Sequence, residues 1–281
     1  MSKLAPSLKA LINAPSARPG PTPAAKGIAD VYARIAREAE GRNLGFRPWV
    51  AMSAAATFTL NSPSSLTHLH ALASSSPSAA SPVQAAELIR EVGLKCISFN
   101  GIPRTINSLN AFRDALPPSV QSRLETGASR QPTARNLEAR LRGGRALWDS
   151  VYAPHERKLF DKLALAHPDL PVYILAGHYA LLLSDPVGDE GGAGRGGLAG
   201  LGRVLTSLVA ISCLRSQTGV GPQVLSHVYG LRKGVEDGTY EGDVGKDEAA
   251  WLASDEGGEW VLNSVDSIRS CLGEEGFTSK L

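Results

Sequence analysis

Apolar residues recur every three or four positions along most of this 281-residue chain, and almost no segment alternates apolar and polar residues with a period of two. The first spacing places side chains on one face of an α-helix, whereas the second is typical of a half-buried strand. The pattern therefore predicts an all-α protein. The predicted helices cover residues 27–42, 49–60, 66–72, 82–96, 105–116, 140–152, 156–166, 170–183, 203–217, 222–233 and 261–272.

Breaks in the helical pattern suggest two related helical units. We expect a flexible N-terminal segment over residues 1–26, a first unit over 27–118, a linker over 119–139 and a second unit over 140–281. Residues 186–202 of the second unit are rich in glycine and poor in apolar groups, which predicts an exposed loop. Each unit has an apolar helix, a short break and a helix carrying a histidine, so a duplicated unit is our interpretation.

Composition and charge exclude several classes of protein. The chain is 43% hydrophobic and 20% charged, as is typical of globular proteins. A net charge of +2 with no run of basic residues argues against a nucleic-acid partner. No apolar run is long enough to predict a membrane span. The three cysteines are too few and too scattered for a disulfide framework, and we expect Cys96 and Cys213 to be buried among apolar residues.

The N-terminal segment resembles a mitochondrial presequence. Residues 1–29 contain no aspartate or glutamate but several basic residues, and Leu4, Leu8, Leu11 and Ile12 can form an apolar stripe. A basic, amphipathic and acid-free start is typical of mitochondrial targeting. The alternative is a disordered tail rich in alanine and proline, which carries no address and leaves the protein in the cytoplasm.

The stretch from Arg203 to Gly234 has the strongest signal for a functional site. An apolar helix ends at a glycine-containing break, Pro222 starts a second helix, and His227 falls on the apolar stripe of that helix. A histidine in such a position can act as a general acid or base, because its pKa lies near neutrality and the helix fixes its direction. The alternative is a buried histidine that only bonds to the surrounding protein.

Three segments of the chain resemble the carboxymuconolactone decarboxylase family, whose members have the all-helical AhpD-like fold. Residues 87–116 resemble the family's helix–Gly-x-Pro–helix segment, and residues 142–183 resemble the run that enters a family domain. Residues 203–234 resemble the helical hairpin that ends in the family's histidine, here His227. The resemblance implies an AhpD-like helical bundle built from two units, and a homo-oligomer.

The chain departs from the peroxidase branch of that family at the positions that carry its chemistry. In that branch a Cys-x-x-Cys pair precedes the histidine, but here those positions hold Val220 and Gln223. Leu208 occupies the region of the branch's acidic proton relay. A dithiol cycle needs one cysteine as nucleophile and a second to resolve the sulfenic acid, so we expect no such cycle at this place.

Our leading functional hypothesis is a non-redox enzyme that acts on a small carboxylic or carbonyl compound, with His227 as acid or base. The substrate would be bound by polar side chains that the resemblance places nearby, namely Arg203, Arg215, Gln223 and Arg104. The alternative is a catalytically inactive mitochondrial module with a structural or assembly role, whose partner is a second copy of the chain. Neither hypothesis requires a cofactor.

No metal site is predicted, because His68 and His70 point in different directions on a helix. We expect one of them to face inward, and we favour His68 as the counterpart of His227.

Overall fold

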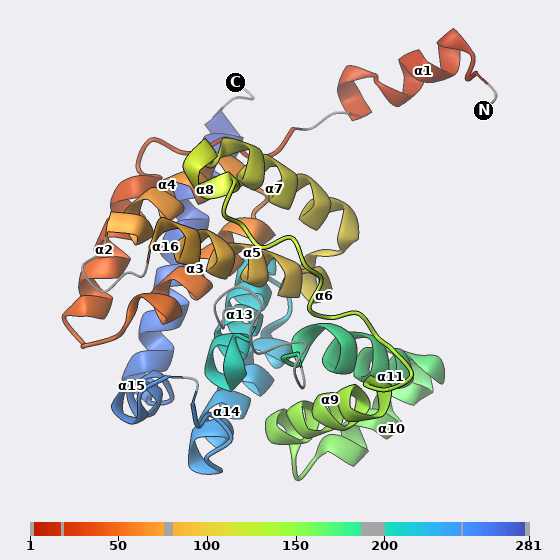
Figure 1. The fold of residues 1–281 in the computed structure, drawn as a ribbon, viewed down its shortest axis with the longest axis vertical. Coiled ribbons are helices and arrows are strands. Elements are labelled where there is room, and N and C mark those ends of the chain that lie inside the picture. Colours follow the sequence, from red (N-terminus) through yellow and green to blue (C-terminus); the bar gives the residue numbers. More distant parts are fainter. Residues whose placement is uncertain (1–2, 18–19, 76–80, 187–199, 243, 279–281) are drawn as a thin grey trace.

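All regular secondary structure in the described residues of the computed structural model is helical, with no strand among them (Figure 1). The described ranges are residues 3–17, 20–75, 81–186, 200–242 and 244–278. The prediction of an all-α protein is therefore confirmed. None of the described helices is both long and apolar enough to cross a lipid bilayer.

The predicted helices are present in the predicted order, with ends that differ by up to six residues, and the structure adds short helices, among them 118–121 and 246–252, that were not predicted. The first half contains α1 (Pro6–Ile12), α2 (Ile28–Glu40), α3 (Phe46–Thr59), α4 (Pro63–Ser75), α5 (Pro82–Lys95), α6 (Ile97–Asn100), α7 (Ile102–Ala115) and α8 (Pro118–Gln121), with a short 3₁₀-helix η1 (Pro15–Ala17) after α1. The second half contains α9 (Leu137–Tyr152), α10 (Glu156–Ala166), α11 (Asp169–Tyr173), the π-helix η2 (Ile174–Leu183), α13 (Gly202–Gln217), α14 (Gly221–Glu236), α15 (Lys246–Leu252) and α16 (Asp255–Thr278).

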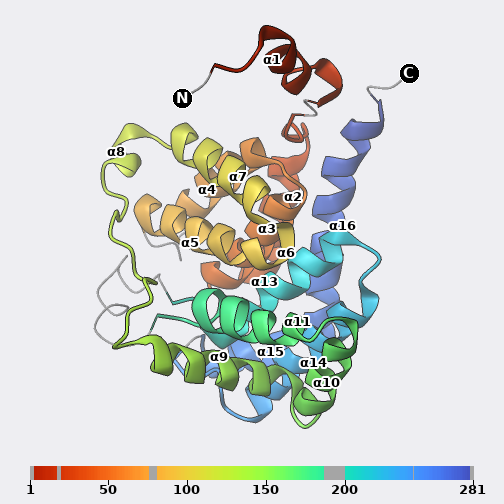
Figure 2. The same cartoon turned by 90° about the vertical axis from the view of Figure 1, so that its right-hand side faces the viewer.

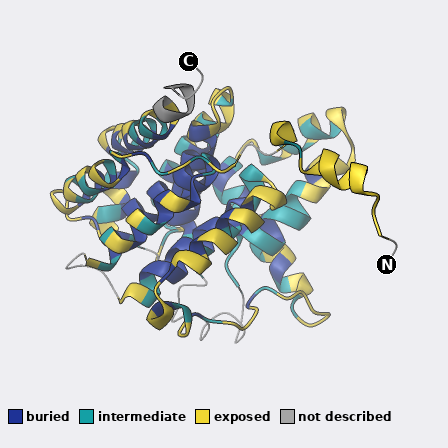
Figure 3. Cartoon of the chain, turned by 90° about the horizontal axis from the view of Figure 1, so that it is seen from above, coloured by how far each residue is buried: buried dark blue, intermediate teal, exposed yellow. Residues whose placement is uncertain are grey.

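Helices α3 and α13 lie against each other at the centre of the molecule. Nearly every residue of both helices is buried, and the buried centre is visible in Figure 3. Both helices are apolar or carry small side chains on all sides, and a helix of that kind must be covered all round. Helices α2, α4, α5 and α16 cover α3, while α14 and α16 pack on α13.

The two predicted units share one hydrophobic core. A continuous cluster of buried apolar side chains runs from Ala25 to Leu272 and includes α3 and α5 as well as α13 and α16. A smaller cluster, formed by Trp148, Tyr179 and Leu183, lies between α9 and η2. The proposed units are therefore segments of one packed body in the described chain.

Helices α9 and η2 cross with their backbones in direct contact. A Cβ atom added to Gly144 would lie only 2.3 Å from the Cα atom of Ala180, so only glycine fits at this crossing. The contact brings α9, η2 and α14 together beside α13, at the lower end of the molecule in Figure 2. This arrangement positions the residues of the candidate site.

Three segments that we predicted to be flexible or exposed are partly held by the body. Thr22 bonds to the carbonyl groups of Leu60 and Asn61, so the N-terminal segment is anchored before residue 26. The predicted linker has a buried Leu124 and forms no helix between α8 and α9. Most of the predicted loop 186–202 lies outside the described residues, but Leu201 at its end is buried, which corrects the end of that loop.

Candidate functional site

His227 lies on the inner face of α14, with 8% of its surface exposed. Its Nε2 atom is 3.5 Å from the hydroxyl oxygen of Tyr152 on α9. The Tyr152 hydroxyl accepts a hydrogen bond from the hydroxyl of Tyr179 at 3.1 Å, and its ring packs on Trp148. The buried position predicted for His227 is confirmed, and the structure adds the three aromatic side chains beside it.

His227 is neutral at pH 7 in its position beside these aromatic side chains. Burial, assisted by the positive charge of Arg203, lowers the pKa of His227 to about 4. Burial also raises the pKa of the hydroxyl groups of Tyr152 and Tyr179, so both remain protonated. Efficient acid–base catalysis favours a pKa near the working pH. The cluster is therefore better suited to packing and hydrogen bonding than to proton transfer at pH 7.

Arg203, in the first turn of α13, connects three helices. Its Nε donates to the Ser150 hydroxyl of α9 at 2.8 Å, and one terminal nitrogen donates to the Gly230 carbonyl of α14 at 2.6 Å. Its other terminal nitrogen donates to the Ser207 hydroxyl. A Cβ atom at Gly234 would lie 3.2 Å from the guanidinium carbon, so glycine makes room for Arg203 there. The guanidinium group thus holds α9, α13 and α14 together.

Two of the other predicted substrate-binding residues, Arg215 and Arg104, have no contact with His227, whereas Gln223 lies one helical turn before it on α14. Arg215 is twelve residues further along α13 than Arg203, which corresponds to about 18 Å at the rise of an α-helix. It forms an ion pair with Asp266 of α16, with a shortest distance of 2.5 Å. Gln223 and Arg104 are exposed on α14 and α7. Of the predicted set, Arg203 lies close enough to His227 to act on its charge, and Gln223 is the neighbour of His227 one turn earlier on α14.

One histidine of the His68–His70 pair is buried, as expected, but it is His70. Its Nε2 lies 2.9 Å from the Pro82 carbonyl oxygen, and burial lowers the pKa of its ring. His68 is exposed, so the expectation that it mirrors His227 is wrong. Among the described residues, no three potential metal ligands of the His, Cys, Asp or Glu type lie close enough together to hold an ion.

Cys96 and Cys213 are buried, as predicted, and they meet across the molecule. Their sulfur atoms are 3.5 Å apart, although the residues are 117 positions apart in the chain. Burial and the neighbouring thiol raise the pKa of Cys96 well above its usual value. A thiol reacts as its thiolate, so the Cys96 thiol is protected against oxidation at neutral pH.

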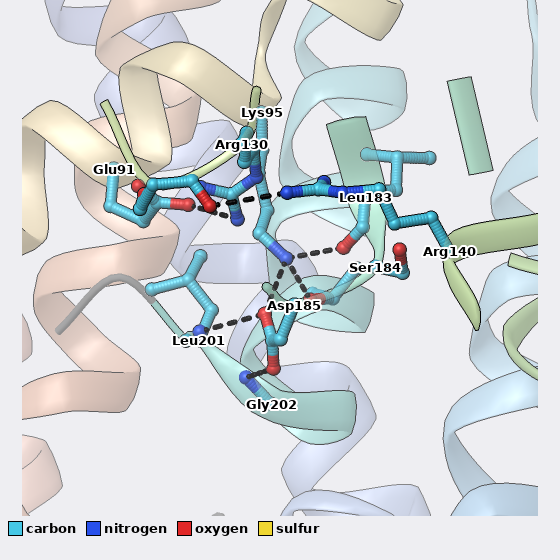
Figure 4. Close-up of polar contacts among 12 residues, drawn as sticks. Glu91, Lys95, Arg130, Arg140, Leu183, Ser184, Asp185, Leu201 and Gly202 are labelled. Atoms are coloured by element: carbon cyan, nitrogen blue, oxygen red, sulfur yellow. Dashed lines mark hydrogen bonds and ion pairs between the residues drawn. The ribbon is translucent and has the colours of Figure 1, made fainter. Parts of the chain in front are cut away.

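An ion pair between a fully buried lysine and a half-buried aspartate, which the sequence analysis missed, joins the two halves of the chain. Lys95 at the end of α5 is completely buried. Its ammonium group donates to Asp185 and to the Thr206 hydroxyl, both at 3.0 Å, and to the Leu183 carbonyl (Figure 4). Three oxygen partners satisfy the three donors of an ammonium group.

Asp185 also fixes the start of α13. Its carboxylate accepts hydrogen bonds from the backbone N–H groups of Gly202 at 2.8 Å and Leu201 at 3.1 Å (Figure 4). Burial alone would raise the pKa of Asp185, but the charge and hydrogen bond of Lys95, together with these N–H groups, hold it below its usual value. A carboxylate at a helix N-terminus is favourable, because the first N–H groups have no partner within the helix.

Two further buried carboxylates of α5 hold the segment between α8 and α9. Glu91 forms an ion pair with Arg130 at 2.6 Å, and Glu87 accepts a hydrogen bond from the backbone N–H of Glu125 at 2.7 Å. Glu87, Glu91 and Lys95 are spaced four residues apart and therefore form one row on α5. This row binds the predicted linker on one side and the start of α13 on the other.

A cavity of about 550 Å³ opens beside this ion pair, between α3, α9, α13 and residues 239–242. Its volume lies within the usual range for small-molecule sites. The charged residues in its wall are Arg47, Asp185, Arg203 and Glu241, and the hydroxyl-bearing residues are Ser150, Ser184, Thr206, Thr239 and Tyr240. His227 is not among the residues that line it.

Comparisons with protein-family models, with curated proteins and with solved structures found no match to this chain. The resemblance to the carboxymuconolactone decarboxylase family, with its AhpD-like fold, therefore stays a prediction.

The lowered pKa of His227 predicts an acid-sensitive stability. The unfolded chain binds a proton at a pKa near 6.5, whereas the folded chain binds it at about 4. Stability from the neutral ring is therefore present above pH 6.5 and is lost as the pH falls toward 4. By linkage, the protonation of His227 should cost the wild type about 2 kcal/mol of its free energy of unfolding between pH 7 and pH 5. His227→Gln should not show this part of the loss.

Urea denaturation at the two pH values measures this difference, and His68→Gln provides the matched control because His68 is exposed. The control should keep the full pH dependence of the wild type. A His227→Gln variant with an unchanged pH dependence would show that His227 does not titrate as described.

Proposed function

We propose that this protein binds a small organic acid in the cavity between α3, α9 and α13. The observation that carries the proposal is that two arginines, Arg47 on α3 and Arg203 on α13, are among the residues that line one cavity of ligand size. An arginine side chain is well suited to a carboxylate, because its planar fork of donors matches the two carboxylate oxygens.

The remaining charges of the cavity support an acidic rather than a basic ligand. Asp185 lines the wall, but its charge is already opposed by Lys95 and by the N-terminus of α13. Glu241 is the second carboxylate of the wall. Among the described residues, and with Lys95 behind the wall included, the three cationic groups outnumber the two carboxylates by one. The hydroxyl groups of Ser150 and Thr206 provide partners for a hydroxyl or carbonyl group of the ligand.

Binding without chemistry at His227 is the form of the hypothesis that we favour. His227 has a pKa of about 4 and contacts Tyr152, and it does not line the cavity. Arg203 donates to protein oxygen atoms from all three of its nitrogens, and one terminal nitrogen of Arg47 donates to the Gly200 carbonyl at 3.2 Å. We place the direct ligand contact at Arg47. A small carboxylic compound is also the ligand class that the family resemblance implies.

Thermal unfolding in the presence of a panel of small mono- and dicarboxylic acids tests the proposal. At least one acid should raise the melting temperature in a saturable way, with a gain of about 2.7 kcal/mol at one hundred times its dissociation constant. Arg47→Gln should weaken that acid's affinity at least tenfold, because one charged partner of the carboxylate is lost.

Arg104→Gln is the matched control, since Arg104 is exposed on α7 and does not line the cavity. It should bind the acid as the wild type does. The proposal fails if no acid of the panel stabilises the protein, or if Arg47→Gln binds with unchanged affinity.

Two segments of the sequence resemble import signals. The acid-free N-terminal segment is the basis for a mitochondrial location. Residues 279–281 are Ser-Lys-Leu, which is a peroxisomal address where it ends a chain. For a chain that ends at Leu281 we propose the peroxisome, because this tripeptide matches fully. The N-terminal segment, by contrast, has a single arginine, Arg18, whereas mitochondrial segments are rich in arginine.

Immunofluorescence of the untagged chain in its own cells tests the location. The wild type should coincide with a peroxisomal marker, and removal of residues 279–281 should release it. A Lys3→Gln/Lys9→Gln control should stay peroxisomal. Coincidence of the wild type with a mitochondrial marker, lost in the lysine variant, would support the presequence interpretation instead.

A further inference from the structure

Helix α1 projects from the helical body and buries none of its residues (Figures 1 and 2). Viewed from above, it is exposed along its whole length (Figure 3). Its stability therefore does not come from packing against the rest of the described chain. A helix of seven residues is marginal on its own in water, so a surface that covers one of its faces would stabilise it.

The apolar residues of this segment lie together. Leu8, Leu11 and Ile12 are spaced three and four residues apart and share one face of α1, and Leu4 precedes the helix. Between 44% and 72% of each of these four side chains is exposed. Single exposed leucines are ordinary, but an uninterrupted stripe on a projecting helix marks an interaction surface.

The positive charge of the N-terminal segment indicates what kind of surface α1 binds. Lys3 and Lys9 accompany the stripe, Arg18 and Lys26 follow it, and residues 1–29 contain no acidic side chain. Cationic side chains beside an apolar stripe favour the interface of a bilayer that contains anionic lipids. Lysine suits such a surface because its charge is compact and its stem is flexible, so no fixed partner geometry is needed.

The connection between α1 and the body allows this contact without a change in the fold. Thr22 is anchored to the Leu60 carbonyl at 3.0 Å, and nine residues separate it from Ile12. Nine residues can span at most about 30 Å. The helix can therefore lie flat on a surface while the core and the cavity stay as they are.

We infer that α1 is an interfacial anchor that docks this protein on membranes carrying anionic phospholipids. Leu4, Leu8, Leu11 and Ile12 enter the boundary between headgroups and acyl chains, and Lys3 and Lys9 contact lipid phosphates. The anchor lies on the surface and does not span the bilayer. It is independent of the ligand proposed for the cavity.

Sedimentation of the full chain with protein-free vesicles tests this inference. Vesicles of 30% phosphatidylserine in phosphatidylcholine should bind the wild type at least tenfold more tightly than vesicles of phosphatidylcholine alone. The double variant Leu8→Asp/Leu11→Asp should not bind to either kind of vesicle. Lys3→Gln/Lys9→Gln should remove the preference for the anionic vesicles.

Leu165→Asp is the matched control, because Leu165 is 87% exposed and lies on α10, outside α1. This variant should bind the vesicles as the wild type does. Thermal unfolding should be the same for all variants, since α1 contributes nothing to the core. The inference is overturned if the wild type does not sediment with anionic vesicles, or if Leu8→Asp/Leu11→Asp sediments equally well. Binding to a protein import receptor without any binding to vesicles would also overturn it.

Discussion

The ion pair between Lys95 and Asp185 is the interaction on which the arrangement of the two halves depends. Lys95 is completely buried at the end of α5, and a buried ammonium group is costly unless its charge and all its donors are matched. Asp185 supplies the opposite charge and also bonds to the N–H groups that begin α13. One carboxylate therefore fixes a helix of the second half against a helix of the first.

The position of α13 in turn determines the candidate site. Arg203 lies in the first turn of α13, directly after the N–H groups that Asp185 holds, and it connects this helix to α9 and α14. The cavity is lined by the same carboxylate, by Arg203 and by Arg47 of the neighbouring α3. His227 lies on the other side of Arg203, among aromatic rings. One arginine, Arg203, thus lies between the polar cavity and the apolar cluster.

Most helices could be predicted from the sequence, because their apolar spacing is a local property. The buried face of His227 followed from the same spacing. Lys95 could not be identified in this way, since its partner Asp185 is 90 positions away and lies after the end of a predicted helix, just before the glycine-rich loop. The spacing of Glu87, Glu91 and Lys95 on an apolar helix was an available signal. For pairs such as Cys96 and Cys213, only the fold shows which residues meet.

A double-mutant cycle of Lys95→Met and Asp185→Asn, measured by urea denaturation at pH 7, tests this account most directly. Asp185→Asn leaves the buried ammonium group of Lys95 without its opposite charge, so this variant should lose about 3 kcal/mol of the free energy of unfolding. Lys95→Met should lose less, because the Asp185 side chain is 35% exposed and water solvates its charge. The double variant should lose clearly less than the sum of the two, with a coupling of about 2 kcal/mol. Losses that simply add, or single losses below about 0.5 kcal/mol, would contradict a central role for this ion pair.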